Sequence, residues 1–193
     1  MFPLFETIKI QHHTVFLFED HWARMKHSMK ALSGRALNFK LTENHILQEI
    51  KTDGLFKCRV LYNENEYQIE IVSYEKRHIE KIVCIQDDNL SYPLKFTDKN
   101  GFIKHTSNLP ATTEPIFVVD GFLTDSSYSN IALWNGREWH TPKAPLFFGV
   151  RRNALLSENR IVEKEIAYKD IHQYQKVSLI NAMLDLEELE ITL

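Results

Sequence analysis

The sequence predicts an α+β protein built in two parts. In the first part, the apolar residues Trp22, Met25, Met29 and Leu32 recur at helical spacing. In the second part, short apolar runs alternate with turn signals, as in a β-rich domain. With 193 residues, 44% of them hydrophobic, the chain can bury a sizeable core. We expect a boundary at the polar run 87–89, which gives residues 1–88 and residues 89–193 as the two parts.

The first part is predicted to combine two helices with five strands. The helical spacing favours a helix over 19–33, and Gly34 is a suitable residue to end it. Thr42 can cap a second helix that runs to about residue 51. The expected strands are 5–10 and 15–18, joined in a hairpin by a polar turn, and then 57–62, 66–72 and 82–85.

The second part is predicted to hold short strands and short helices. Asn135-Gly136 lies between two strand-like runs and is a strong signal for a hairpin. Residues 150–156 have the pattern of a short helix. The expected strands are 117–119, 131–134, 138–140, 161–166 and 177–180.

Composition argues against several classes of partner. The net charge is −3 and no basic run occurs, so neither nucleic acid nor another polyanion is an expected ligand. The N-terminus lacks the features of a signal peptide, and no apolar run approaches the roughly 18–20 residues that span a membrane. Cys58 and Cys84 are expected to be buried thiols, and His12-His13 is not expected to bind a metal. These features favour a location in the cytoplasm.

Several short motifs occur in a fixed order along the chain. The most specific is a Thr-Asp pair followed by Ser-Asn and then by Thr-Pro. The motif stretches are Phe5-Glu6-Thr7-Ile8, His21 to Ser28, Lys95 to Lys99, Leu123 to Asn130 with Thr141-Pro142, Gly149 to Arg152, and Ile180-Asn181-Ala182. Together they resemble the fold-type IV enzymes that use pyridoxal phosphate (PLP), the class IV aminotransferase family with branched-chain aminotransferase and aminodeoxychorismate lyase.

This resemblance implies a two-part fold-type IV architecture, similar to that of D-amino-acid aminotransferase, in a compact version. The stretch from Lys95 to Asp125 is shorter than is usual in the family, and the usual C-terminal helix is missing. Aspartate stands at position 125, where the family usually has glutamate. The resemblance also implies PLP as cofactor, a small-molecule substrate, and a homodimer with the PLP cleft between the two halves of each chain.

Lys95 is the predicted catalytic residue, because it matches the lysine that forms a Schiff base with PLP in this family. A desolvated lysine can be neutral and nucleophilic near neutral pH, which suits it to this task. Lys104, in Ile103-Lys104-His105, is the alternative. Lys95 is preferred because Lys99 follows where the family often has arginine, and because Lys95 lies at a more usual distance from Asp125.

Asp125 is the residue that the resemblance assigns to the pyridine nitrogen of PLP. A carboxylate beside this nitrogen keeps it protonated by charge. The alternative is that Asp125 caps the turn before Ser126.

Arg24 is the residue that the resemblance assigns to the phosphate, which an arginine can bind through two hydrogen bonds. On a helical wheel Arg24 lies away from the apolar stripe, so a solvent-facing arginine is the alternative. The backbone amides of Val150 and Arg151, and of Asn181 and Ala182, are further candidates to bind the phosphate. Arg59 could bind a substrate carboxylate, although an ordinary surface arginine on a strand is the favoured interpretation.

The expected activity is that of a 4-amino-4-deoxychorismate lyase, which forms 4-aminobenzoate and pyruvate for folate synthesis. A class IV aminotransferase acting on branched-chain or D-amino acids is the first alternative, because it would share the fold and the cofactor contacts. A catalytically inactive relative that binds PLP or a small metabolite is the second.

Overall fold

A computed structural model describes all residues from Met1 to Leu193. The chain divides into two compact units, one of 1–76 with 94–98 and the other of 77–93 with 99–193. The division therefore differs from the predicted boundary near residue 88. It also places Lys95 in the first unit rather than the second, because the backbone N–H of Phe5 donates to the carbonyl oxygen of Lys95 at 3.0 Å.

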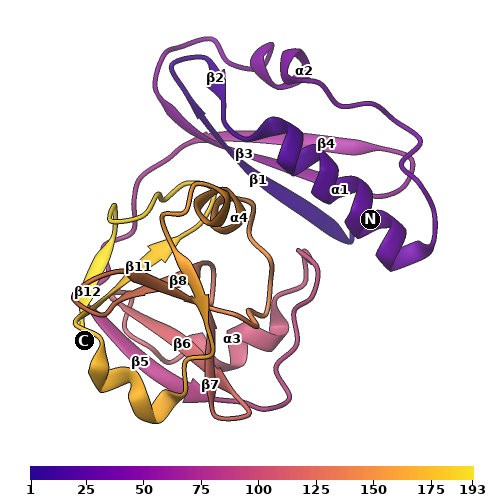
Figure 1. The fold of residues 1–193 in the computed structure, drawn as a ribbon. Coiled ribbons are helices and arrows are strands. Elements are labelled where there is room, and N and C mark those ends of the chain that lie inside the picture. The colour runs from indigo at the N-terminus through magenta and orange to yellow at the C-terminus, as the bar shows by residue number, and fades with distance from the viewer. The chain divides into compact units, whose positions relative to one another are not determined.

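The first unit is a four-stranded antiparallel sheet with one long helix across one face (Figure 1). The strand order is β2-β1-β3-β4. The bounds are β1 (Leu4–Gln11), β2 (Thr14–Val15), α1 (Phe18–Ser33), α2 (Glu43–Leu47), β3 (Leu55–Tyr62) and β4 (Tyr67–Ser73).

The core of the first unit lies between α1 and the inward face of the sheet. Strand β1 alternates, so Leu4, Ile8 and Ile10 face inward together with the carboxylate of Glu6. The helix contributes the fully buried Met25 to the same cluster. The alternation of β4 is thus confirmed, as is the inward position of Trp22, Met25 and Met29. Leu32, the fourth residue of the predicted helical stripe, is instead 40% exposed near the end of α1.

Two predicted boundaries in this unit need correction, and a third is confirmed. The strand expected over 15–18 stops at Val15, because Leu17 adopts a left-handed backbone with φ 53° and Phe18 already begins α1. Gly34 ends α1 as predicted, with φ 74°. Thr42 caps α2 as predicted. The helix ends at Leu47 rather than near residue 51, because the N–H groups of Glu49 and Ile50 each donate to the carbonyl oxygen three residues earlier, as in a 3₁₀ turn.

The second unit holds two sheets and short helices. A three-stranded sheet has the order β5-β6-β7, and a five-stranded sheet has the order β10-β9-β8-β11-β12. The bounds are β5 (Lys81–Gln86), α3 (Asn100–Thr106), β6 (Thr113–Val119), β7 (Phe122–Ser126), β8 (Asn130–Trp134), β9 (Trp139–Pro142), α4 (Val150–Ser157), β10 (Val162–Lys164), η1 (Tyr168–Gln173), β11 (Lys176–Ile180) and β12 (Glu190–Thr192).

Strand pairing in the second unit confirms one predicted hairpin and assigns one predicted strand to this unit. The Asn135-Gly136 hairpin between β8 and β9 is confirmed, with Gly136 at φ 94°. The strand predicted over 82–85 is real, but it pairs in parallel with β6 and so belongs to this unit. The pattern did not predict α3, β7, η1 or β12, which are short and are held by tertiary contacts.

Neither cysteine is paired, and Cys58 is buried whereas Cys84 is only partly buried. Burial raises the pKa of Cys58 to about 12 and also raises the pKa of Cys84. The predicted burial is therefore confirmed for Cys58 and met only in part by Cys84, and a raised pKa makes a thiol a poor nucleophile because little thiolate is present. Among the helices, none is both long enough and apolar enough to cross a membrane.

Candidate active site

The first unit positions Lys95 on an extended segment beside β1. The Thr97 N–H donates to the carbonyl oxygen of Pro3 at 2.9 Å, and Leu4 bridges to Phe96. Leu94 and Phe96 pack against the apolar core of this unit. Because side chains alternate along an extended segment, Lys95 points the other way, and its Nζ lies 4.8 Å from the centroid of the Phe5 ring.

Arg59 contacts the same aromatic ring as Lys95. The guanidinium carbon of Arg59 lies 5.1 Å from the Phe5 centroid, so the two cations are within about 10 Å of one another. Arg59 lies opposite Glu70 in the β3–β4 pair, and its Nη1 binds Glu70 Oε2 at 3.0 Å. The structure therefore brings Lys95 and Arg59 to one face of the sheet, with Arg59 partly exposed and ion-paired.

Arg24 lies on α1 and binds Glu6 on the face of the sheet that packs against this helix, which is the face opposite Phe5. Its Nε donates to Glu6 Oε1 at 2.9 Å and its Nη2 donates to Glu6 Oε2 at 2.5 Å. The side chain of Arg24 is only 14% exposed, and that of Glu6 is fully buried. Arg24 is therefore not a solvent-facing arginine: the helix presents it as one half of a buried, bidentate ion pair.

His21 completes this buried group from one helical turn before Arg24. Its Nδ1 lies 2.8 Å from Glu6 Oε2, and burial lowers the pKa of the imidazole. Burial alone would raise the pKa of Glu6, but the charge of Arg24 and the hydrogen bonds from His21 and Arg24 lower it to about 2. Glu6 is therefore an anion at neutral pH, and it fixes the position of the Arg24 guanidinium.

Lys104, the alternative catalytic lysine, lies on α3 in the second unit. Its Nζ lies 2.7 Å from Asp87 Oδ2, and more than half of its side chain is exposed. His105 contacts the same carboxylate at 2.8 Å, and the hydrogen bonds from Lys104 and His105 lower the pKa of Asp87 to about 2. An exposed, ion-paired ammonium is a poor nucleophile, so this geometry argues against Lys104.

Asp125 is the second-to-last residue of β7 in the second unit and is buried. Asn130 Nδ2 donates to Asp125 Oδ1 at 2.7 Å, and the Phe147 N–H donates to Oδ2 at 2.9 Å. Burial raises the pKa of Asp125 to about 7. Ser126, not Asp125, accepts the turn amide of Ser129 at 3.0 Å. Asp125 is thus a buried carboxylate whose hydrogen-bond donors are neutral amides.

The start of α4 presents backbone donors in the same unit. Gly149 precedes the helix in an extended conformation, and no side chain caps this end. The amides of Val150 and Arg151 have no acceptor within the helix, and the helix dipole adds positive potential there. A Cβ at Gly149 would overlap Asn130 Oδ1, so only glycine permits this approach. Such an end is suited to binding an anion.

The turn at Asn181-Ala182 is tied to the same region. Asn181 Nδ2 donates to Ser129 Oγ at 2.8 Å. The guanidinium of Arg151 binds Asp185, with Nη2 at 2.6 Å from each carboxylate oxygen. The side chain of Arg151 is therefore engaged by Asp185, and only its backbone N–H is a candidate to bind a ligand.

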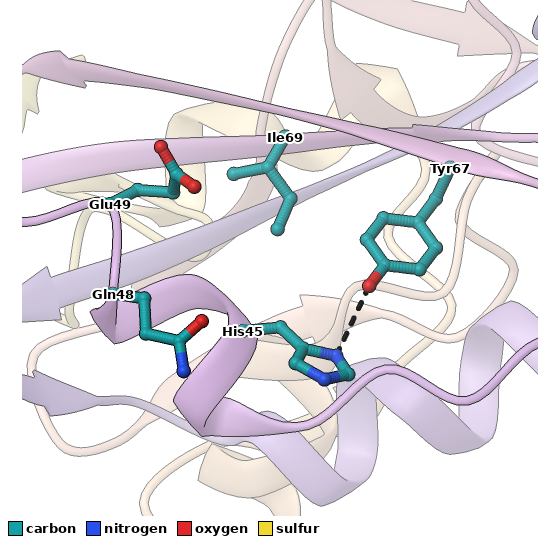
Figure 2. A pocket seen from close by; sticks show the side chains of 5 residues that line it. All are labelled: His45, Gln48, Glu49, Tyr67 and Ile69. Atoms are coloured by element: carbon teal, nitrogen blue, oxygen red, sulfur yellow. Dashed lines mark hydrogen bonds between the residues drawn. The ribbon is translucent and has the colours of Figure 1, made fainter.

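A separate hollow lies in the first unit, between α2 and β4 (Figure 2). There His45 Nδ1 lies 3.1 Å from the hydroxyl of Tyr67, while Gln48 and Glu49 line the opposite side. None of the predicted site residues lines this hollow, and its polar groups are exposed. It is therefore not the candidate site.

These features define an α+β protein with a lysine on an extended segment, a buried carboxylate and a glycine-led helix start whose first amides have no acceptor within the helix. Residues 3–105 and 110–186 match the model of the amino-transferase class IV family. The chain therefore belongs to the class IV aminotransferase family, whose enzymes depend on PLP and act as lyases or aminotransferases.

The relatives match this chain over nearly its whole length. An uncharacterized protein of Haemophilus influenzae is 30% identical over 95% of this chain and 98% of its own. A solved structure from Haemophilus somnus, provisionally named a 4-amino-4-deoxychorismate lyase, is 28% identical, with a TM-score of 0.84 over 96% of this chain and 98% of its own. Another from Mesorhizobium loti, provisionally named an amino-acid aminotransferase, is 22% identical, with a TM-score of 0.79 over 100% and 99%.

The residues present fit PLP. Asp125 is a buried carboxylate without a cation among its hydrogen-bond donors, and a protonated pyridine nitrogen would supply one. The glycine-led start of α4 can receive a phosphate. Lys95 supplies a primary amine.

Four residues that support these groups had no role assigned from the sequence: Glu6, His21, Asn130 and Gly149. All four belong to the short motifs that carry the family resemblance. The signal was therefore present in the motifs. Their roles as partners of Arg24 and Asp125 depend on tertiary contacts, which spacing alone does not give.

Proposed function

We propose that this protein is a PLP-dependent 4-amino-4-deoxychorismate lyase that forms 4-aminobenzoate and pyruvate for folate synthesis in the cytoplasm. The observation that carries the proposal is the likeness to the Haemophilus somnus structure, which extends over 98% of that chain at 28% identity. The buried Asp125 and the position of Lys95 support a working PLP site rather than an inactive one.

Each predicted residue has a role in this proposal. Lys95 binds the cofactor covalently, and Asp125 holds a proton on the pyridine nitrogen. The amides of Val150 and Arg151 bind the phosphate, as do Arg24 and the turn at Asn181-Ala182. Bound PLP supplies an electron sink for the carbon that carries the substrate amine.

The reaction needs one proton removed at a defined atom. The Lys95 amine would take the proton from the ring carbon that bears nitrogen. The bond between the ring and the enolpyruvyl oxygen would then break, the ring would become aromatic, and the released enolpyruvate would take up one proton to become pyruvate. Arg59, within about 10 Å of the Lys95 amine, binds a carboxylate of the substrate.

A class IV aminotransferase is the second candidate. The closeness of Arg59 and Lys95 also suits an amino acid, whose amine and carboxylate share one carbon. In this case the same lysine would remove and return the proton, PLP would supply the electron sink, and hydrolysis by water would release a keto acid.

The deciding experiment incubates purified protein and PLP with aminodeoxychorismate, and separately with pairs of amino acids and keto acids. The lyase predicts pyruvate and 4-aminobenzoate in equal amounts, and Lys95→Ala as the control forms neither. Amino-group transfer without 4-aminobenzoate would establish the aminotransferase. A colourless protein after incubation with PLP, inactive on all substrates, would contradict both.

We also propose a homodimer, as in relatives of this fold type, because a chain this short needs additional buried surface around a cofactor. Sedimentation of the PLP-loaded protein measures this. A monomer that retains PLP would contradict it.

A further inference from the structure

Asn130 is buried at the start of β8 and contacts three parts of the second unit. Its Nδ2 donates to Asp125 Oδ1 and to the carbonyl oxygen of Phe147, each at 2.7 Å. Its Oδ1 occupies the place that a Cβ of Gly149 would take. One side chain therefore contacts the buried carboxylate, the loop before α4 and the residue that caps α4.

These contacts close a ring of hydrogen bonds. The N–H of Phe147 donates to Asp125 Oδ2, while the carbonyl oxygen of the same residue accepts from Asn130. Asn130 in turn donates to the other oxygen of Asp125. Because Phe147 lies two residues before Gly149, the ring fixes the start of α4 relative to the Asp125 carboxylate.

We propose that Asn130 is a positioning residue that sets the spacing between the carboxylate of Asp125 and the phosphate-binding amides of α4. The inference rests on the proposed function: PLP has a rigid ring, and a short CH2–O link confines its phosphate to a narrow range of distances from the ring nitrogen. A protein that binds both ends is best served by holding its two contacts within that range before the ligand arrives.

The side-chain chemistry at position 130 is specific. The planar amide offers two N–H donors and one acceptor on a short stem. Alanine would remove both donors, and aspartate would place a second anion against Asp125. Besides these neutral amides, the positive charge of Arg152 also acts on Asp125 and favours its ionised carboxylate.

Asn130 also determines how readily Asp125 ionises. Its hydrogen bond favours the charged carboxylate and opposes the effect of burial. Loss of this bond should therefore raise the pKa of Asp125. As the pH is lowered, the variant should therefore lose affinity for PLP at a higher pH than the wild type does. The reason is that only ionised Asp125 can pair with a protonated pyridine nitrogen.

The test compares wild type, Asn130→Ala and Gly149→Ala, with Asn153→Ala as the control. Asn153 lies on the exposed side of α4. Two quantities are measured: the pKa of Asp125 in the cofactor-free protein, by carbon NMR of labelled aspartate, and the dissociation constant of PLP against pH. We expect Asn130→Ala to raise the pKa by about one unit and the dissociation constant about tenfold.

Gly149→Ala should shift both quantities in the same direction, since its Cβ displaces the Asn130 amide, and it decides the matter if Asn130→Ala does not fold. Asn153→Ala should change neither. An unchanged Asp125 titration, or a shifted titration with an unchanged PLP dissociation constant, would overturn the inference. If the wild type binds no PLP, the proposed function fails separately, and the titration alone decides whether Asn130 holds Asp125.

Discussion

The Arg24 guanidinium is held by both carboxylate oxygens of Glu6, in an ion pair formed between α1 and β1 inside the first unit. Glu6 is fully buried, and His21 makes a third contact with it. Such a pair need not stabilise the fold much in total, since both charges are desolvated. It does fix the direction of the arginine that we propose for the phosphate.

Glu6→Gln should destabilise the protein strongly, because it leaves Arg24 charged and without its anionic partner. Breaking a buried ion pair in this way typically costs about 3–5 kcal/mol. Urea unfolding measures the loss. Glu64→Gln is the matched control: Glu64 pairs with the exposed Arg35, so its removal should cost about 1 kcal/mol or less. Equal losses in the two variants would contradict the role of Glu6.

The stability of the wild type should also fall in acid through Glu6. Folding lowers its pKa from the ordinary value of 4.5 to about 2, so the folded state binds this proton less readily than the unfolded state. The stabilisation is complete above pH 4.5 and is lost as the pH falls through about 2. Urea midpoints between pH 6 and pH 2 should therefore decline less steeply for Glu6→Gln. Parallel declines would show that other groups dominate.

Arg24→Ala should weaken PLP binding more than it slows turnover at saturating PLP. A charge-assisted hydrogen bond contributes about 1.5–3 kcal/mol, which corresponds to roughly tenfold or more in affinity. Titration of the cofactor-free protein with PLP gives the dissociation constant. An unchanged constant in a folded variant would remove Arg24 from the phosphate site and leave it as the partner of Glu6.

Asp125→Asn should retain covalently bound PLP but lose most turnover, because an amide cannot hold the pyridine nitrogen protonated by charge. Asp125→Glu restores the usual family residue and should be milder. Steady-state kinetics and the absorption spectrum of both variants measure this. If Asp125 served only in local hydrogen bonding, Asp125→Asn would be nearly silent and Asp125→Glu the worse of the two. Full activity of Asp125→Asn would falsify the cofactor role.

Much of the fold could be predicted because its periodic segments pack one face on a core. The helical stripe with Met25 and Met29 and the alternation of β4 were sufficient for α1 and β4. The hairpin of β1 and β2 was predicted, but the ends of α2 and β2 were not predictable, because single turns and one left-handed residue, Leu17, decide them.

The candidate site was predictable as a set of residues but not as an arrangement. The motifs indicated Lys95 and Asp125, yet the placement of Lys95 in the first unit depends on backbone pairing with Phe5. The Glu6–Arg24 pair joins residues from a strand and a helix, and the Asn130–Phe147 contact spans a loop. Such tertiary pairings leave no local pattern in the sequence.

Borohydride trapping shows which lysine binds the cofactor. Purified protein is incubated with PLP and reduced with borohydride, and the labelled peptide is identified by mass spectrometry. We predict a single label on Lys95, which is lost in Lys95→Ala and retained in Lys104→Ala. A label on Lys104 in the wild type, or no covalent label while PLP is present, would overturn the assignment of Lys95.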